Sequence, residues 1–147
     1  MNRNTIDAKR VINGTHGELW LDGEYVAEVT GFQAKIALKK EPVTMCGDMA
    51  EKQKVVGWSG TGSIQMNKVY SRMANKLAKV LSEGTDARFI IISKLADPDS
   101  YGSERVVIKD VSFDDLTLAD WAANTPGKIE APFTFSAYEF RDSIRVE

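Results

Sequence analysis

The sequence has very few of the side chains that most often carry catalysis or bind metals. Its 147 residues include one cysteine, Cys46, and one histidine, His16. A single cysteine excludes a disulfide within the chain, and one cysteine with one histidine is too small a set for a four-ligand zinc site. His16 lies in a polar N-terminal stretch, with no spacing that pairs it with Cys46 as a nucleophile and base. We therefore expect a protein that is not an enzyme and that holds no cofactor and no metal.

Long apolar runs and an excess of one charge are also missing. The longest apolar run, Phe89–Ile92, has the length of a strand and falls far short of the roughly 18 residues of a membrane span. Met1–Gly17 lacks the apolar core of a signal peptide, so we expect synthesis in the cytoplasm and no membrane partner. The net charge of −2 disfavours a binder of duplex DNA, which needs a cationic face. It leaves open a surface past which DNA slides without being bound.

Two acidic patterns imitate functional sites. Asp97–Gly102 begins like a calcium loop, but Ile108 stands where the final glutamate should be, so an acidic β-turn fits better. Asp114 and Asp115 are adjacent on a predicted strand, Phe113–Leu118. Neighbouring strand residues point to opposite faces, so this pair does not share a substrate atom.

Alternation of apolar and polar residues predicts strands from the start of the domain. Gly17–Leu21 is followed by Asp22-Gly23, a pair typical of a type I′ turn because both residues need positive φ. The strand after this turn is predicted to continue to Leu38, with a bulge at Gly31.

A second long alternating segment, Val55–Met66, is predicted to pair with the segment that ends at Leu38. Its glycines at 60 and 62 do not precede a helix, as a dinucleotide fingerprint requires. They indicate strong strand curvature or the close approach of another backbone.

One helix is predicted over 69–83 from the helical spacing of apolar residues, with Gly84 as its left-handed C-terminal residue. Further strands are predicted over Arg88–Leu95, Arg105–Lys109 and Ile129–Phe140. The fold class is therefore mainly β: a single domain over 1–147, built as a β-barrel or sandwich of about seven strands with one helix.

The segments 1–16 and 39–54 show no periodicity. We interpret the first as a loose N-terminal arm and the second as an extended loop between two long strands. Apolar residues among mixed charges on such a loop suit a partner surface, although a mobile loop without function remains the alternative. The residues predicted to contact a partner are Lys39, Lys40, Pro42, Met45, Met49, Lys52 and Lys54.

The order of these parts resembles the phage tail tube protein family. The resemblance is carried mainly by Gly31–Leu38 before the loop and by Val55–Ile64 after it, and it covers nearly the whole chain. It implies a subunit that closes into rings of six, rings that stack into a tube, and a lumen through which DNA passes without specific binding. Segments 39–54, 1–16 and 141–147 would make the contacts between subunits.

The resemblance also implies partners and a location. Other copies of the chain, a tail sheath and a baseplate or initiator protein would be the partners. The site of action would be the tail of a virion or of a defective prophage particle. A tube subunit of a secretion system with the same architecture is a close alternative.

Two other functions remain open at this point. A closed barrel with a capping helix can hold a small ligand, and a spacious apolar interior would favour that function. An enzyme of another class would need carboxylates that converge in a pocket, for example Glu130 or Glu139 with an aspartate.

Overall fold

The computed structural model describes residues 5–145. In these residues the elements are η1 (Ala8–Arg10), η2 (Gly14–His16), β1 (Gly17–Leu21), β2 (Glu24–Tyr25), β3 (Val29–Val43), β4 (Lys52–Asn67), α1 (Arg72–Glu83), β5 (Phe89–Leu95), β6 (Glu104–Phe113), β7 (Lys128–Phe135) and β8 (Ala137–Asp142). The mainly β prediction is confirmed, with eight strands in the described part of the chain.

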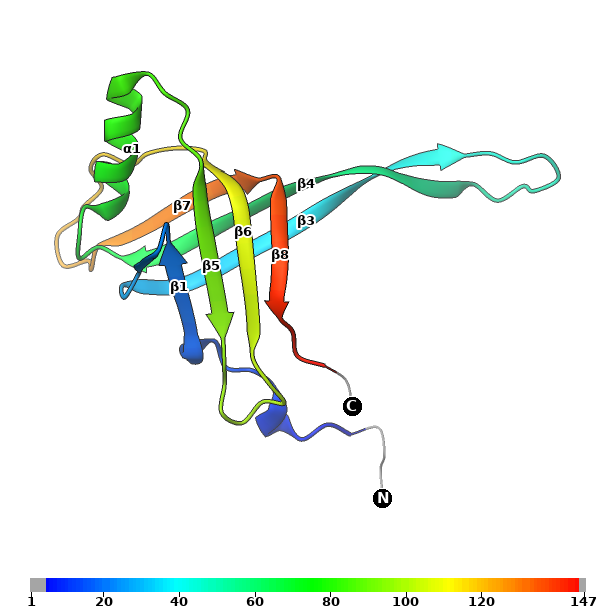
Figure 1. Cartoon of the computed structure of the whole chain (residues 1–147), viewed down its shortest axis with the longest axis horizontal. Coiled ribbons are helices and arrows are strands. Elements are labelled where there is room, and N and C mark those ends of the chain that lie inside the picture. Colours follow the sequence, from blue (N-terminus) through cyan, green and yellow to red (C-terminus); the bar gives the residue numbers. More distant parts are fainter. Residues whose placement is uncertain (1–4, 146–147) are drawn as a thin grey trace.

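The strands form two groups that cross each other (Figure 1). Hydrogen bonds connect them in the order β2-β1-β5-β6-β7-β4-β3, and β8 pairs with β6 beside that path. β6 belongs to both groups, because Arg105–Lys109 pair with β8 whereas Ser112 and Phe113 pair with β7. The path is open and ends at β2 and β3. The molecule is therefore a crossed, antiparallel two-layer sandwich rather than a closed barrel.

The chain turns from one layer to the other at two neighbouring points. Asp110 has a φ of 57°, which bends β6 between its two partners. Ser136 separates β7 from β8, and its hydroxyl donates a hydrogen bond to the Asp110 carboxylate. This bond joins the two corners at which the chain passes between the layers.

The core lies between the layers and is built from alternate residues of the facing strands. One layer contributes Ile64, Met66, Ala131, Phe133 and Phe135, and the other contributes Leu19, Leu21, Ile91, Ile108 and Val111; all are buried. Phe133 is the centre, with ring centroids of Phe32, Phe113 and Phe135 at 5.9, 6.1 and 6.2 Å. Each fully buried side chain of this kind stabilises the fold by about 1.5–3 kcal/mol.

Two glycines of β4 make room for these rings. A Cβ on Gly60 would lie 2.5 Å from the Phe135 ring, and one on Gly62 would lie 2.5 Å from the Phe133 ring. The rings therefore pack directly on the backbone of β4. The predicted close approach of another backbone is found at Gly62, where a Cβ would meet the Gln33 carbonyl of β3. At both Gly60 and Gly62, aromatic rings also approach the backbone, which was not predicted.

The opening hairpin is confirmed, with φ of 51° at Asp22 and 84° at Gly23. The predicted continuous second strand is wrong, because β2 ends at Tyr25 and β3 begins in the other layer at Val29. Val26 between them is fully buried, and its amide donates to the Leu19 carbonyl. The pairing of β3 with β4 shifts between Val29 and Gly31, as the predicted bulge requires.

The helix begins three residues later than predicted, at Arg72, and ends before Gly84, which has a φ of 69° as expected. Residues 69–71 remain outside it because Asn67 still pairs with β7 and Lys68 bonds to the Gly127 carbonyl. Arg72 fastens the helix to the body through Glu28, whose carboxylate lies 3.0 Å from Nε. The predicted strand Phe113–Leu118 is also wrong: β6 ends at Phe113, and 114–127 is a loop.

Replacing Gly62 by alanine should destabilise the protein by about 1–3 kcal/mol, because the new methyl group has to displace the Phe133 ring or the backbone of β3. Gly57→Ala is the matched control on the same strand, since its methyl group would only touch the Lys39 side chain at 3.8 Å. Urea unfolding of both variants measures the difference. Equal midpoints for the two variants would contradict the packing described above.

Candidate functional site

The predicted loop 39–54 is mostly a two-stranded ribbon. β3 and β4 stay paired as far as Val43 and Lys52, so the unpaired tip is only 44–51. The sequence concealed these strands for two reasons. Both faces of the ribbon meet solvent, so no buried face imposes a period of two. The pairing also shifts between Lys39 and Lys40, which changes the side that each later residue faces.

The ribbon leaves the body and projects far beyond the sandwich (Figure 1). Of the residues predicted to contact a partner, Lys39, Lys40 and Pro42 lie on β3, Lys52 and Lys54 lie on β4, and Met45 and Met49 lie in the tip. All of them are exposed, and Met49 is as open to solvent as in an extended peptide, at 105 %. The structure therefore gathers the whole predicted set on one projecting element.

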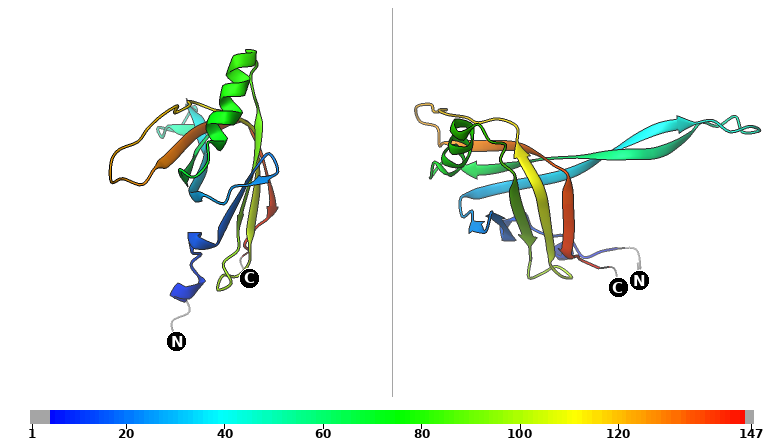
Figure 2. Two further views of the ribbon diagram at one scale, coloured as in Figure 1. Left: turned by 90° about the vertical axis from the view of Figure 1, so that its left-hand side faces the viewer. Right: turned by 45° about the horizontal axis from the view of Figure 1, so that its top comes forward.

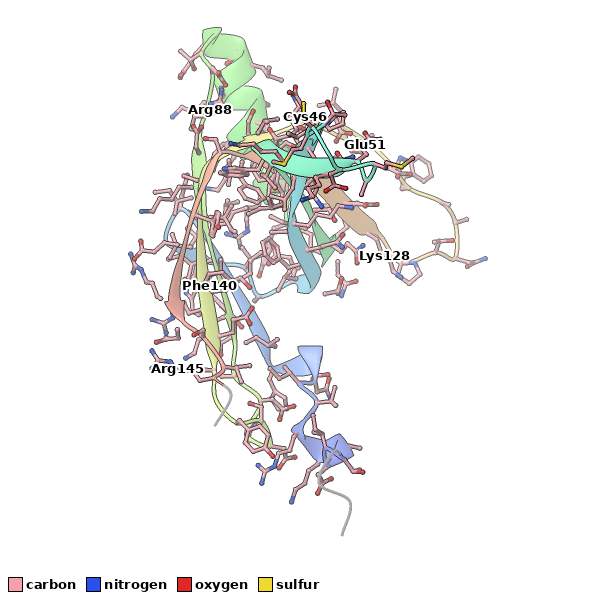
Figure 3. All side chains as sticks on the ribbon, turned by 90° about the vertical axis from the view of Figure 1, so that its right-hand side faces the viewer. Cys46, Glu51, Arg88, Lys128, Phe140 and Arg145 are labelled. Carbon is pink, nitrogen blue, oxygen red and sulfur yellow. The ribbon has the colours of Figure 1, made fainter. Side chains whose placement is uncertain are left out.

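The tip has its own local order. Gly47 has a φ of 81°, and the Asp48 amide donates to the Met45 carbonyl. The Asp48 carboxylate accepts the Ala50 amide and lies 3.2 Å from the Lys52 ammonium. These two contacts hold the pKa of Asp48 below its ordinary value, and the hydrogen bond from the Ala50 amide has the larger effect. The tip is thus a defined turn that presents its methionines outward, and Cys46 is exposed beside them (Figure 3).

An aromatic surface at the foot of the ribbon was not predicted. Trp58, Tyr138 and Phe140 form a chain of ring contacts with centroid distances of 5.9 and 6.2 Å, and all three are 40–58 % exposed. Tyr138 and Phe140 also line a surface groove of about 470 Å³ between β3, β6 and β8, which we call the β3–β8 groove. The signal in the sequence is a change of phase after Ser136. The buried row of β7 falls on odd positions, whereas the large apolar residues Tyr138 and Phe140 fall on even ones.

A second projecting element was also missed. The loop 114–127 exposes Leu118 at 77 % and Trp121 at 87 %. The signal in the sequence is Trp121 shortly before the turn residues Thr125-Pro126-Gly127, but the incorrect strand over 113–118 obscured the loop.

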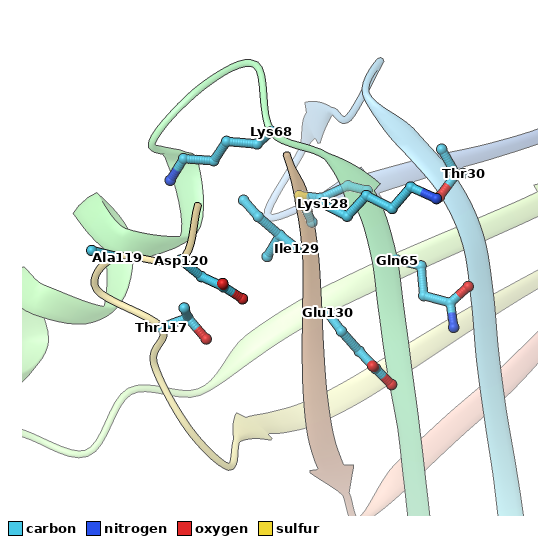
Figure 4. Close-up of a pocket in the computed structure, with 10 residues that line it drawn as sticks. Thr30, Gln65, Lys68, Thr117, Ala119, Asp120, Lys128, Ile129 and Glu130 are labelled. Carbon is cyan, nitrogen blue, oxygen red and sulfur yellow. The ribbon is translucent and has the colours of Figure 1, made fainter. Parts of the chain in front are cut away.

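A hollow of about 450 Å³ lies beside this loop, against β4 and β7 (Figure 4). Its lining combines Lys68 and Lys128 with Asp120 and Glu130, and it includes no cysteine and no histidine. The other suggested carboxylate, Glu139, lies elsewhere, 3.3 Å from the Lys109 ammonium. This hollow is polar and open to solvent, unlike the spacious apolar interior that a ligand-binding barrel needs.

The predicted loose arm is docked over its described part, residues 5–16. The Asn13 amide donates to the Asp97 carboxylate at 2.8 Å, and Arg10 donates to the Asp99 carbonyl at 3.1 Å. Arg10 also stacks on the Tyr101 ring at 4.9 Å. The turn that imitates a calcium loop is therefore a receptor for the arm. Residues 1–4 of the predicted arm and residues 146–147 of the segment 141–147 lie outside the described residues.

Asp97 is the centre of this contact. It is buried, and its second oxygen accepts the Asp99 amide at 2.9 Å. The amides of Asp99 and Asn13, with His16 at 4.0 Å, hold the pKa of Asp97 below its ordinary value. Among residues 5–145 no three His, Cys, Asp or Glu side chains gather as metal ligands would.

Comparison with known proteins identifies the family. The family model described as "Phage tail tube protein" matches residues 4–142. The chain belongs to the phage tail tube family.

One relative of this tail tube protein is the phage-like element PBSX protein XkdM of Bacillus subtilis strain 168. It is 30 % identical over 141 residues, which cover 95 % of this chain and 96 % of the relative. The tail tube fold is also found in two cryo-EM structures of injection assemblies. A chain of the anti-feeding prophage cap matches with a TM-score of 0.73 and 9 % identity, covering 95 % of this chain and 97 % of its own length.

A chain of the sheath–tube complex of the extracellular contractile injection system PVC matches with a TM-score of 0.66 and 8 % identity, covering 96 % of this chain and 94 % of that one. At these identities the likeness concerns the fold. This tail tube protein is a structural subunit, and no helix in residues 5–145 has the length and apolar character of a membrane span.

Asp97→Asn should release the arm of this tail tube protein. The carboxylate contributes its stabilisation above pH 3.8 and loses it as the pH falls through the lowered pKa of the folded state. We therefore expect the NMR resonance of the Asn13 amide to titrate with a midpoint below 3.8. At neutral pH, trypsin should cleave after Lys9 and Arg10 faster in Asp97→Asn than in Asp99→Asn, which keeps the Asp97 carboxylate. Equal cleavage rates would show that Asp97 does not hold the arm.

Proposed function

We propose that this tail tube subunit assembles into six-membered rings that stack into a tube, and that the tube encloses a channel for DNA. The observation that carries the proposal is the β3–β4 ribbon. Its outer half extends beyond the sandwich, and its tip exposes Met45 and Met49 to solvent. A soluble protein has little reason to display flexible apolar side chains on an ordered projection unless a partner buries them.

Other copies of the same chain are the partner that fits the family. The lysines of the ribbon, at 39, 40, 52 and 54, flank the acids at 41, 48 and 51. A surface that carries both signs of charge can complement the same surface on another copy of the chain. Two identical surfaces of one sign would repel each other. Methionine tips can adapt to the surface that receives them.

Sheath and baseplate proteins are proposed as further partners. Chains with this fold occur in the six-fold symmetrised baseplate of the anti-feeding prophage, with a TM-score of 0.62 and 9 % identity, and in the PVC sheath–tube complex. The same matches support a second candidate function, a tube subunit of a contractile injection system. In either function the chain is made in the bacterial cytoplasm and acts in a virion tail or a related particle.

The proposed channel needs a wall past which DNA slides without being held. The net charge of −2 provides no general attraction for phosphates. The face of β4 that points away from the core is made of neutral polar side chains, at Ser59, Thr61, Ser63 and Gln65. Such a face is hydrated without binding phosphate tightly, which suits the wall of the channel.

Shortening the ribbon should abolish tube formation and leave the fold intact. Residues 42–53 are replaced by Asn-Gly, which joins the paired residues Glu41 and Lys54 through a type I′ turn and keeps the register of the remaining strands. The double substitution Met45→Ser and Met49→Ser tests the tip alone. Because none of these residues belongs to the core, the free energy of unfolding in urea should stay within about 0.5 kcal/mol of that of the parent protein.

Electron microscopy of concentrated protein, with and without a baseplate-like initiator, measures the result. Tubes are expected from the parent protein and from Cys46→Ser, the control in the same tip. Shortened variants that still form normal tubes would exclude the ribbon as the assembly element.

A further inference from the structure

The loop 114–127 has the features of a docking element. Leu118 and Trp121 are exposed at 77 % and 87 %. A tryptophan side chain removes 150–250 Å² from water when it is buried, and it is enriched among the few residues that dominate protein interfaces. The loop contains Asp114, Asp115 and Asp120 and no lysine or arginine, so it carries a net charge of −3.

The β3–β8 groove has complementary features. Its apolar lining includes Ile36, Leu95, Val106, Phe135, Tyr138 and Phe140, and its volume of about 470 Å³ lies in the range of sites that hold large organic groups. Phe140 also borders an adjoining hollow that contains Arg141 and Arg145 with one acid, Asp142. Figure 3 shows Phe140 on β8 and Arg145 just beyond the end of this strand. The surface therefore offers an apolar slot next to a cationic end.

The loop and the groove lie on opposite sides of the molecule. In Figures 1 and 2 the 114–127 loop projects beside α1, whereas β8 lies on the side from which the ribbon leaves. A copy cannot insert its own loop into its own groove. Two different patches that fit each other make a head-to-tail contact, which repeats from copy to copy and closes a ring or extends a stack.

We propose that the 114–127 loop of one copy docks in the β3–β8 groove of the next copy, with Trp121 in the apolar slot and the aspartates toward Arg141 and Arg145. The proposal rests on the self-assembly proposed above and names a contact through which it occurs. The ribbon tip is the other apolar element that could fill the groove. Segment 39–54 has four lysines and three acids, a net charge of +1, so it matches the cationic end less well than the loop does.

Cross-linking tests the contact directly. Ala122→Cys, beside Trp121, is combined with Ser143→Cys, in the hollow beside Phe140, on a Cys46→Ser background. A short bis-maleimide linker applied to assembled tubes should give a ladder of covalent multimers, and either cysteine alone should give at most dimers. Native Cys46 supplies the competing probe, because Ser143→Cys with Cys46 retained would form the ladder if the ribbon tip occupied the groove.

Charge reversal supplies a second measurement. Asp115→Lys with Asp120→Lys, or Arg141→Glu with Arg145→Glu, should each raise the concentration needed for assembly at least about tenfold. An equimolar mixture of the two reversed subunits should recover assembly, because alternating copies place a basic loop in an acidic groove and an acidic loop in a basic groove. The chain that carries all four changes should also recover assembly. Trp121→Ala should lose assembly, and its unchanged urea midpoint would show that the fold is intact.

The outcomes separate this contact from the general function. The docking proposal is overturned if tubes form but the cysteines at 122 and 143 give no ladder. It is also overturned if a ladder forms only between Cys46 and the cysteine at 143. Both results leave the tube function standing. Parent protein that never assembles, even with an initiator, overturns both. A ladder at 122 and 143 together with recovery in the four-fold charge variant establishes the contact.

Discussion

The packing of Phe133 and Phe135 on the bare backbone of β4 is the contact on which the rest of the structure depends. Gly60 and Gly62 let the two rings lie where a Cβ would otherwise stand. The rings then fill the space between crossed layers that share only β6. A larger residue would displace the Phe135 ring at position 60, and the Phe133 ring or the backbone of β3 at position 62, and would open the core at its centre. The crossed arrangement in turn sends β3 and β4 out sideways, so the ribbon begins where the core ends.

The same two strands therefore serve two purposes along their length. Their inner halves, which include Phe32, Ile64 and Met66, pack into or against the core and obey a period of two. Their outer halves have hydrogen bonds between strands but no layer to cover them, and the shift at Lys39 and Lys40 reorients the ribbon. An isolated two-stranded ribbon is marginally stable in water. Here the inner halves fix its register, and so the ribbon can remain ordered while it projects.

The sequence was most informative where local chemistry decides the backbone. Asp22-Gly23 and Gly84 could be assigned because positive φ restricts the choice of residue, and the core rows could be assigned because burial imposes alternation. The sequence was least informative in the outer ribbon and in the 114–127 loop, because these segments have no buried face that would impose a regular spacing of apolar residues. The docking of the arm could not be predicted from the sequence, because Asn13 and Asp97 are 84 residues apart and no sequence motif links them. The family resemblance, carried by segments flanking the ribbon, was sufficient for the overall function but not for these contacts.

The exposed apolar surface of the subunit is divided among small sites rather than gathered in one. The ribbon tip offers Met45 and Met49, the loop offers Leu118 and Trp121, and the groove offers Tyr138 and Phe140. Each site offers two large apolar side chains, and even a buried aromatic side chain removes only about 150–250 Å² from water, so each site alone falls short of the roughly 800 Å² per partner of a stable interface. In the proposed assembly, two free subunits that meet through one site alone would therefore separate again. In the proposed assembly, a subunit that adds to an existing ring would engage several sites at once, and the resulting effective concentrations would make the combined contact strong. Division of the apolar surface thus favours growth from a nucleus over aggregation in solution, which is the behaviour that a polymerising tube subunit requires.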